Sequence, residues 1–81
     1  MEAKKIWFDR ENIFVETTTN QTAHMPLSWF KKLQAATLQQ LEEYELWDNN
    51  RWIHWEALGE DLSIDGFFTF HKNNHENKIL M

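Results

Sequence analysis

Two stretches decide the fold of this chain: IHWEALGEDLSI at residues 53–64 and PLSWFKKL at residues 26–33. We interpret the first as a short strand, with Trp52 and Trp55 on one side of it, that runs into an acidic turn. The second is a turn at Pro26, which lacks the N–H that a central strand needs, followed by the start of a helix. Together they indicate a fold more clearly than they indicate a chemistry.

The residues before Pro26 predict an antiparallel meander. Residues 4–8, 13–18 and 21–25 form three short extended segments with polar turns between them. The middle segment alternates β-branched residues with polar and aromatic ones, a pattern typical of a strand. Asn20 tolerates the positive φ that the second turn needs.

A helical pattern follows Pro26. The larger side chains recur at steps of three and four residues, at Phe30, Leu33, Thr37, Leu41 and Tyr44. Ser28 is placed to cap the start, and Thr37-Leu38-Gln39-Gln40 fits a capping box. We expect either one helix from residue 29 to about 45 or two short helices broken near residues 36–37, and the capping box favours the break.

The second half returns to extended structure. Residues 48–51 predict a turn, residues 52–55 a fourth strand, residues 62–64 a brief extended piece and residues 65–70 a last helical turn. The predicted fold class is α+β: a small antiparallel sheet of three to four strands packed on one helical segment, with a short C-terminal helical turn. We expect one domain over residues 1–70 and a polar tail over residues 71–81.

Charge and composition narrow the function. The chain carries 8 basic and 13 acidic residues, a net charge of −5, which disfavours direct nucleic-acid binding and favours a basic protein partner. It lacks cysteine, so a disulfide or a thiolate site is excluded. No window of 18 apolar residues predicts a membrane span. We therefore expect a cytoplasmic monomer or weak homo-oligomer that binds no membrane.

The densest carboxylate cluster comprises Glu56, Glu60, Asp61 and Asp65. It lacks the spacing of a calcium-binding loop, and the simplest interpretation is a polar turn. A different interpretation is an acidic rim around Trp55 that meets arginines of a partner. On that interpretation the candidate partner-binding residues are Trp55, Glu56, Glu60 and Asp61.

Catalysis and metal binding have little support. His71 and His75 lie four residues apart but lack a third ligand, and His54 is better explained as a partly exposed cross-strand residue. The two glycines build no phosphate-binding loop, and no serine lies in a nucleophile elbow. We expect no catalytic, cofactor-binding or metal-binding residue, no cofactor, and no enzyme activity.

The aromatic residues are too numerous for so small a core. The chain has five Trp, six Phe and one Tyr, and strand neighbours such as Trp7 and Phe8 must point to opposite faces. Either the C-terminal segment completes a two-layer core over them, or some aromatic area is exposed or covered by another chain. Exposed apolar patches often mark interaction surfaces.

The three blocks at Ile6 to Asp9, Pro26 to Phe30 and Ile53 to Ser63 resemble the small bacterial proteins of domain of unknown function 2442, over about residues 4–68. The chain departs from the family pattern in three places. The family often has Pro where this chain has Lys31 and Leu38, and it commonly has glycines where this chain has residues 48–51. Its usual Leu-Asp-Glu-Asp turn reads Leu-Gly-Glu-Asp here, at residues 58–61. The family has no established catalytic residues to carry over.

The resemblance implies a context. Such proteins are often encoded beside domain of unknown function 4160, a pairing similar to a toxin–antitoxin module. It implies a non-enzymatic interaction module, an antitoxin-like partner that masks a small basic protein stoichiometrically. The alternative is a transcription-associated regulatory or ligand-sensing domain.

Overall fold

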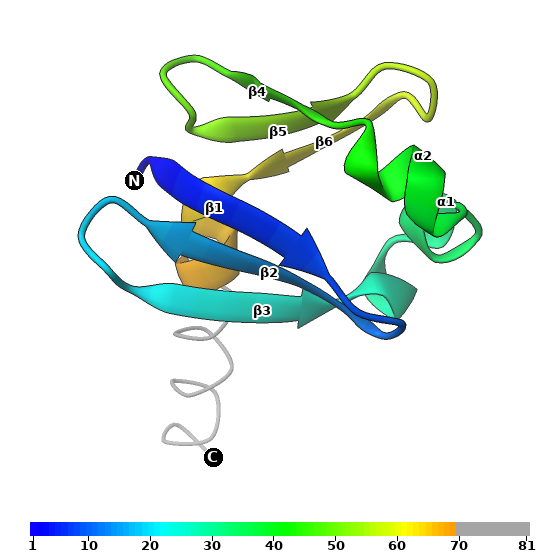
Figure 1. Cartoon of the computed structure of the whole chain (residues 1–81), viewed down its shortest axis with the longest axis horizontal. Coiled ribbons are helices and arrows are strands. Elements are labelled where there is room, and N and C mark those ends of the chain that lie inside the picture. The colour runs from blue at the N-terminus through cyan, green and yellow to red at the C-terminus, as the bar shows by residue number, and fades with distance from the viewer. Residues whose placement is uncertain (70–81) are drawn as a thin grey trace.

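The chain folds around two antiparallel sheets of three strands each (Figure 1). The computed structural model describes residues 1–69. The first sheet has the order β1-β2-β3, with β1 at Ala3–Phe8, β2 at Asn12–Thr17 and β3 at Thr22–Pro26. The second has the order β4-β5-β6, with β4 at Glu45–Trp47, β5 at Trp52–Trp55 and β6 at Glu60–Ser63.

Short helical elements connect the two sheets. They are η1 at Leu27–Trp29, α1 at Lys31–Gln34 and α2 at Leu38–Glu42, and residues 64–69 are also helical. In Figure 1 the second sheet lies above the first, and α1 and α2 lie together at one end of both. The mixed helix and strand content is as predicted. The prediction of a single sheet of three to four strands is wrong, because the protein divides its strands between two sheets.

The predicted N-terminal meander is confirmed. Ile6, Val15 and Ala23 are aligned across the three strands and face the core, as are Phe8, Ile13 and Met25 in the next row. On the other face Trp7 stacks on Phe14, with ring centroids 5.3 Å apart. Trp7 and Phe8 therefore lie on opposite faces, as the two-residue period of a strand requires.

The helix breaks where the capping box predicts. Thr37 accepts a hydrogen bond from the Gln40 amide at 3.1 Å, and the Gln40 side chain accepts one from the Thr37 amide at 2.9 Å. The prediction that Ser28 caps the start of the helix is wrong. Ser28 lies inside η1, and Phe30 is the residue that precedes α1.

The C-terminal part of the predicted helix is a strand. The chain leaves the helical conformation after Glu42, and Glu45–Trp47 pairs with β5 instead. Leu46 lies opposite Ile53 and packs on the core, while Glu45 and Trp47 are exposed. An acidic residue near a helix C-terminus opposes the helix dipole, and Glu45 avoids that penalty because it is exposed in the strand.

Both sheets share one hydrophobic core. Its most deeply buried members come from every layer: Ile13, Val15, Met25, Leu33, Ile53, Trp55, Ile64 and Phe67. Trp55 donates a hydrogen bond from its indole N–H to the carbonyl of Leu41 at 2.9 Å. Trp52 is 42% exposed whereas Trp55 is 1% exposed. Residues three apart in a strand face opposite ways, so the prediction that both lie on one side is wrong.

Candidate functional site

The outer face of the second sheet exposes two tryptophans side by side. Trp47 of β4 is the pairing partner of Trp52 of β5, and their exposed fractions are 47% and 42%. The opposite face of this sheet carries the buried Ile53 of β5 and Leu62 of β6. Because burial of that inner row fixes which way the strands face, both indoles are directed to solvent.

The loop between the two tryptophans is held in a left-handed conformation. Asp48, Asn49 and Asn50 have φ angles of 55°, 56° and 63°, which Asn and Asp adopt more readily than other residues with a side chain. The Arg51 amide closes the loop by donating to the carbonyl of Trp47 at 3.0 Å. The predicted turn at residues 48–51 is thus confirmed.

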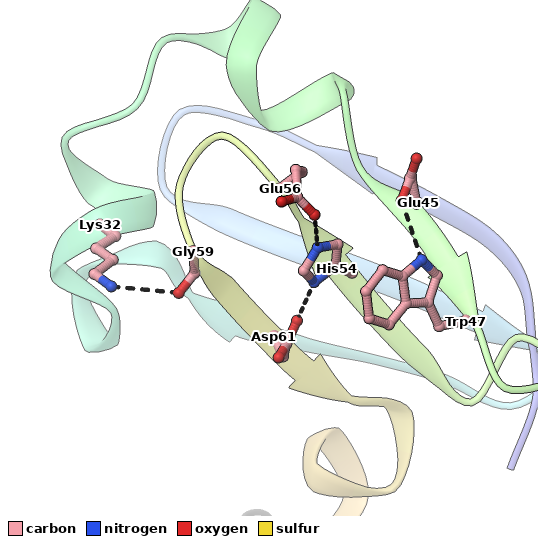
Figure 2. Close-up of polar contacts among 7 residues, drawn as sticks. All are labelled: Lys32, Glu45, Trp47, His54, Glu56, Gly59 and Asp61. Carbon is pink, nitrogen blue, oxygen red and sulfur yellow. Dashed lines mark hydrogen bonds and ion pairs between the residues drawn. The ribbon is translucent and has the colours of Figure 1, made fainter.

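A histidine with two carboxylate partners lies beside Trp47 (Figure 2). The His54 Nε2 atom is 2.7 Å from Glu56 Oε1, and its Nδ1 atom is hydrogen-bonded to Asp61 Oδ1. The Trp47 ring stacks on the His54 ring, with centroids 3.7 Å apart and 21° between the planes. Trp47 also donates from its indole N–H to Glu45 at 3.0 Å.

The carboxylates favour the protonated form of His54. Its pKa is raised above the ordinary value, chiefly by the hydrogen bond to Asp61 and next by that to Glu56, while partial burial opposes the shift. Only the imidazolium can donate from both ring nitrogens. The His54 side chain is 12% exposed, so its ring lies just beneath the surface formed by Trp47.

We define the Trp47 face as Trp47, Trp52, His54 and the carboxylates Glu45, Asp48, Glu56 and Asp61. It contains two of the four predicted partner-binding residues, Glu56 and Asp61, which His54 brings together. Glu60 neighbours Asp61 along β6 and is paired with Trp55. Trp55 is buried and cannot supply surface for a partner, which corrects its prediction as a contact residue.

Sequence reasoning missed Trp47 and Trp52 as members of the site. The signal was present in the alternation of Glu45, Leu46 and Trp47, in which the apolar Leu46 separates two residues that face the other way. It was hidden because Trp47 lies three residues after Tyr44, so that the helical spacing of Leu41 and Tyr44 also continues through this segment.

A hollow lies between the end of β1 and the helices α1 and α2. It has a volume of about 400 Å³. Three polar or charged residues line it, Asp9, Arg10 and Gln34. The rest of its lining is apolar: Phe8, Leu27, Leu33, Ala36, Leu38 and Leu41. Such an apolar hollow with a few polar groups is the usual form of a small-molecule site.

Within residues 1–69, no three His, Asp or Glu side chains converge as a metal site would require. His71 and His75, which the sequence disfavours as a metal site, lie outside the described residues, as do Phe70 and the predicted polar tail. In the same part of the chain, none of the helices has the length and hydropathy needed to cross a membrane.

Comparison with known proteins assigns the chain to a family but not to an activity. No curated protein and no solved structure matches it. The family described as "Protein of unknown function (DUF2442)" matches residues 3–72, which include both sheets. The chain therefore belongs to this family of proteins of unknown function.

Proposed function

We propose that the protein is a non-enzymatic interaction module that binds a small basic protein through the Trp47 face and masks it at one-to-one stoichiometry. The observation that carries the proposal is the exposure of Trp47 and Trp52 beside four carboxylates. Tryptophan is among the residues most enriched in the energetic centres of protein interfaces. The context that the family resemblance implies, a gene pairing similar to a toxin–antitoxin module, favours masking as the outcome.

Charge supports the choice of a basic partner. The chain carries a net charge of −5, and Glu45, Asp48, Glu56 and Asp61 concentrate negative charge around the exposed indoles. Complementary potentials accelerate encounter and fix the orientation of a partner. Trp47 and Trp52 are already exposed in the folded chain, so a partner can dock on them without unfolding the protein. The proposed location of the complex is the cytoplasm.

The test is capture of the tagged protein from its native host, followed by reconstitution of the complex from purified components. The double variant Trp47→Ser/Trp52→Ser should weaken the reconstituted complex at least about tenfold, since each indole removes large apolar area from water. Leu38→Ser is the matched control, because Leu38 is 56% exposed but lies on α2. Equal loss with the control, or none with the double variant, contradicts the proposal.

A ligand-sensing domain is the second candidate, and the hollow beside Leu33 and Leu41 is the observation that favours it. Its volume of about 400 Å³ suits a small apolar molecule. Titration with the fluorescent probe anilinonaphthalene sulfonate should give saturable binding to the native protein. Ala36→Phe should fill the hollow and abolish that binding, and unchanged binding in this variant contradicts a ligand site here.

A further inference from the structure

A hollow on the Trp47 face has the chemistry of a cation cage. It has a volume of about 280 Å³, opens to solvent, and is lined by Trp47, Asp48, Trp52 and Asp61. We infer that this hollow binds the guanidinium group of an arginine side chain. The inference rests on the proposed function, in which the arginine belongs to the basic partner, and it names the group that the Trp47 face recognises.

The lining supplies two kinds of attraction for a cation. The faces of Trp47 and Trp52 carry the negative part of the indole quadrupole, which attracts a cation placed over the ring. Asp48 and Asp61 add formal negative charge and hydrogen-bond acceptors. A volume of about 280 Å³ is at the lower limit of ordinary ligand pockets, and it suits the end of one long side chain.

The geometry favours guanidinium over ammonium. A guanidinium is flat, stacks on aromatic rings and donates two parallel hydrogen bonds to a carboxylate, whereas an ammonium is a compact and strongly hydrated charge. The wall offers both indole surface and carboxylate oxygens. Arginine can use both at once, while lysine can use only one well.

Contacts with residues outside the hollow fix two of the side chains that line it. Trp47 is fixed by the stack on His54 and by its hydrogen bond to Glu45. Asp61 uses Oδ1 to bind His54, and Oδ2 makes no hydrogen bond to any residue that the structure describes. Preorganised groups lose little conformational freedom on binding, which raises affinity.

Nearby positive charge does not cancel the field of the cage. His54 supplies one positive charge when it is protonated. Four carboxylates surround it or lie in the adjoining loop, and they outweigh that charge: Glu45, Asp48, Glu56 and Asp61. Arg51 shares that loop, yet among residues 1–69 it forms no ion pair with either aspartate. A net negative hollow between two indoles remains.

The experiment titrates the isolated 81-residue chain with N-acetyl-argininamide and follows the indole N–H signals by NMR. N-acetyl-citrullinamide is the matched probe, because it keeps the shape and loses the charge. We expect saturable shifts of the Trp47 and Trp52 signals with the arginine probe, and binding weakened at least about fivefold with the citrulline probe. N-acetyl-lysinamide should bind more weakly than the arginine probe.

Variants locate the binding. Trp52→Leu and Asp48→Asn should each weaken the arginine probe about three- to tenfold, and Glu42→Gln, an exposed carboxylate of α2, should leave it unchanged. Asp48→Asn changes only an exposed loop residue, so it tests the cage even if Trp52→Leu fails to fold. Equal binding of arginine and citrulline probes, or of arginine and lysine probes, overturns the inference, as does unchanged binding in Asp48→Asn.

This titration separates the cage from the proposed function because it uses no protein partner. If the NMR shifts are selective for arginine but no partner is captured, the arginine site is supported and the masking function is contradicted. If a basic partner is captured and Trp52→Leu and Asp48→Asn do not weaken its binding, the interaction is supported and the arginine site is contradicted.

Discussion

The Trp47 indole lies almost flat against the His54 imidazole, with ring centroids 3.7 Å apart. This contact joins an exposed residue of β4 to a residue of β5 whose two nitrogens face carboxylates. The protonation state of His54 therefore acts on the outer surface through one ring contact. An imidazolium beneath an indole is a cation–π pair, which favours the stacked position of Trp47.

The pKa of His54 should fall when its partners are removed. Asp61→Asn should lower it more than Glu56→Gln, because the hydrogen bond to Asp61 is the larger cause of the raised value. NMR titration of the His54 ring protons measures both shifts, and Glu42→Gln is the control. A larger effect from Glu56→Gln would show that the order of the two partners is reversed.

Stability should depend on pH through the same residue. Because the folded pKa of His54 is raised, its contribution is full below the ordinary histidine value of about 6.5 and is lost as pH rises through the folded value. The groups that face it are Glu45 from β4, Glu56 after β5 and Asp61 from β6. Urea unfolding of wild type and His54→Gln across this range should show the difference in unfolding free energy shrinking as pH increases.

Trp55 and Trp52 should respond differently to the same substitution. Trp55→Phe removes the indole N–H that donates to the Leu41 carbonyl in the core, and we expect a loss of about 1–3 kcal/mol in unfolding free energy. Trp52→Phe changes an exposed ring and should stay within about 0.5 kcal/mol. Similar losses measured by urea unfolding would contradict the assignment of Trp55 to the core and Trp52 to the surface.

The capping box at Thr37 should hold the start of α2. Thr37→Ala removes the oxygen that accepts from the Gln40 amide, with an expected loss of about 1 kcal/mol in unfolding free energy. Thr37→Ser keeps that oxygen and should retain most of the stability. Gln39→Ala, at an exposed position of the same helix, is the control. No difference between the Ala and Ser variants would show that the cap contributes nothing.

The two glycines should give changes of opposite sign. Gly59 has a φ of +61°, so Gly59→Ala places a side chain in the left-handed region and should destabilise by about 1–2 kcal/mol. Gly66 lies in the helical residues 64–69, where a Cβ would meet Ser63 at an ordinary 3.8 Å. Gly66→Ala should therefore stabilise by about 0.5–1 kcal/mol. Thermal and urea unfolding of the pair check the sign directly.

The candidate site was only partly predictable. The carboxylates Glu56 and Asp61 are visible as a charged cluster in the sequence, and His54 is visible as a cross-strand residue. Their convergence depends on the register of β5 and β6, which places His54 opposite Asp61. Register follows from burial of Ile53 and Leu62 on the inner face, and that burial is decided by the rest of the core.

Residues close in sequence were enough to specify the turns, the capping box at Thr37 and most strands. Pro26 ends β3 by lacking a donor, Thr37 and Gln40 cap each other across three residues, and Asn20 accepts a positive φ, all through short-range sterics and hydrogen bonds. Long-range packing decided the division into two sheets and which of Trp52 and Trp55 is buried. A side chain is buried only when distant segments cover it, so the burial of Trp55 depends on Leu41 and the core around it.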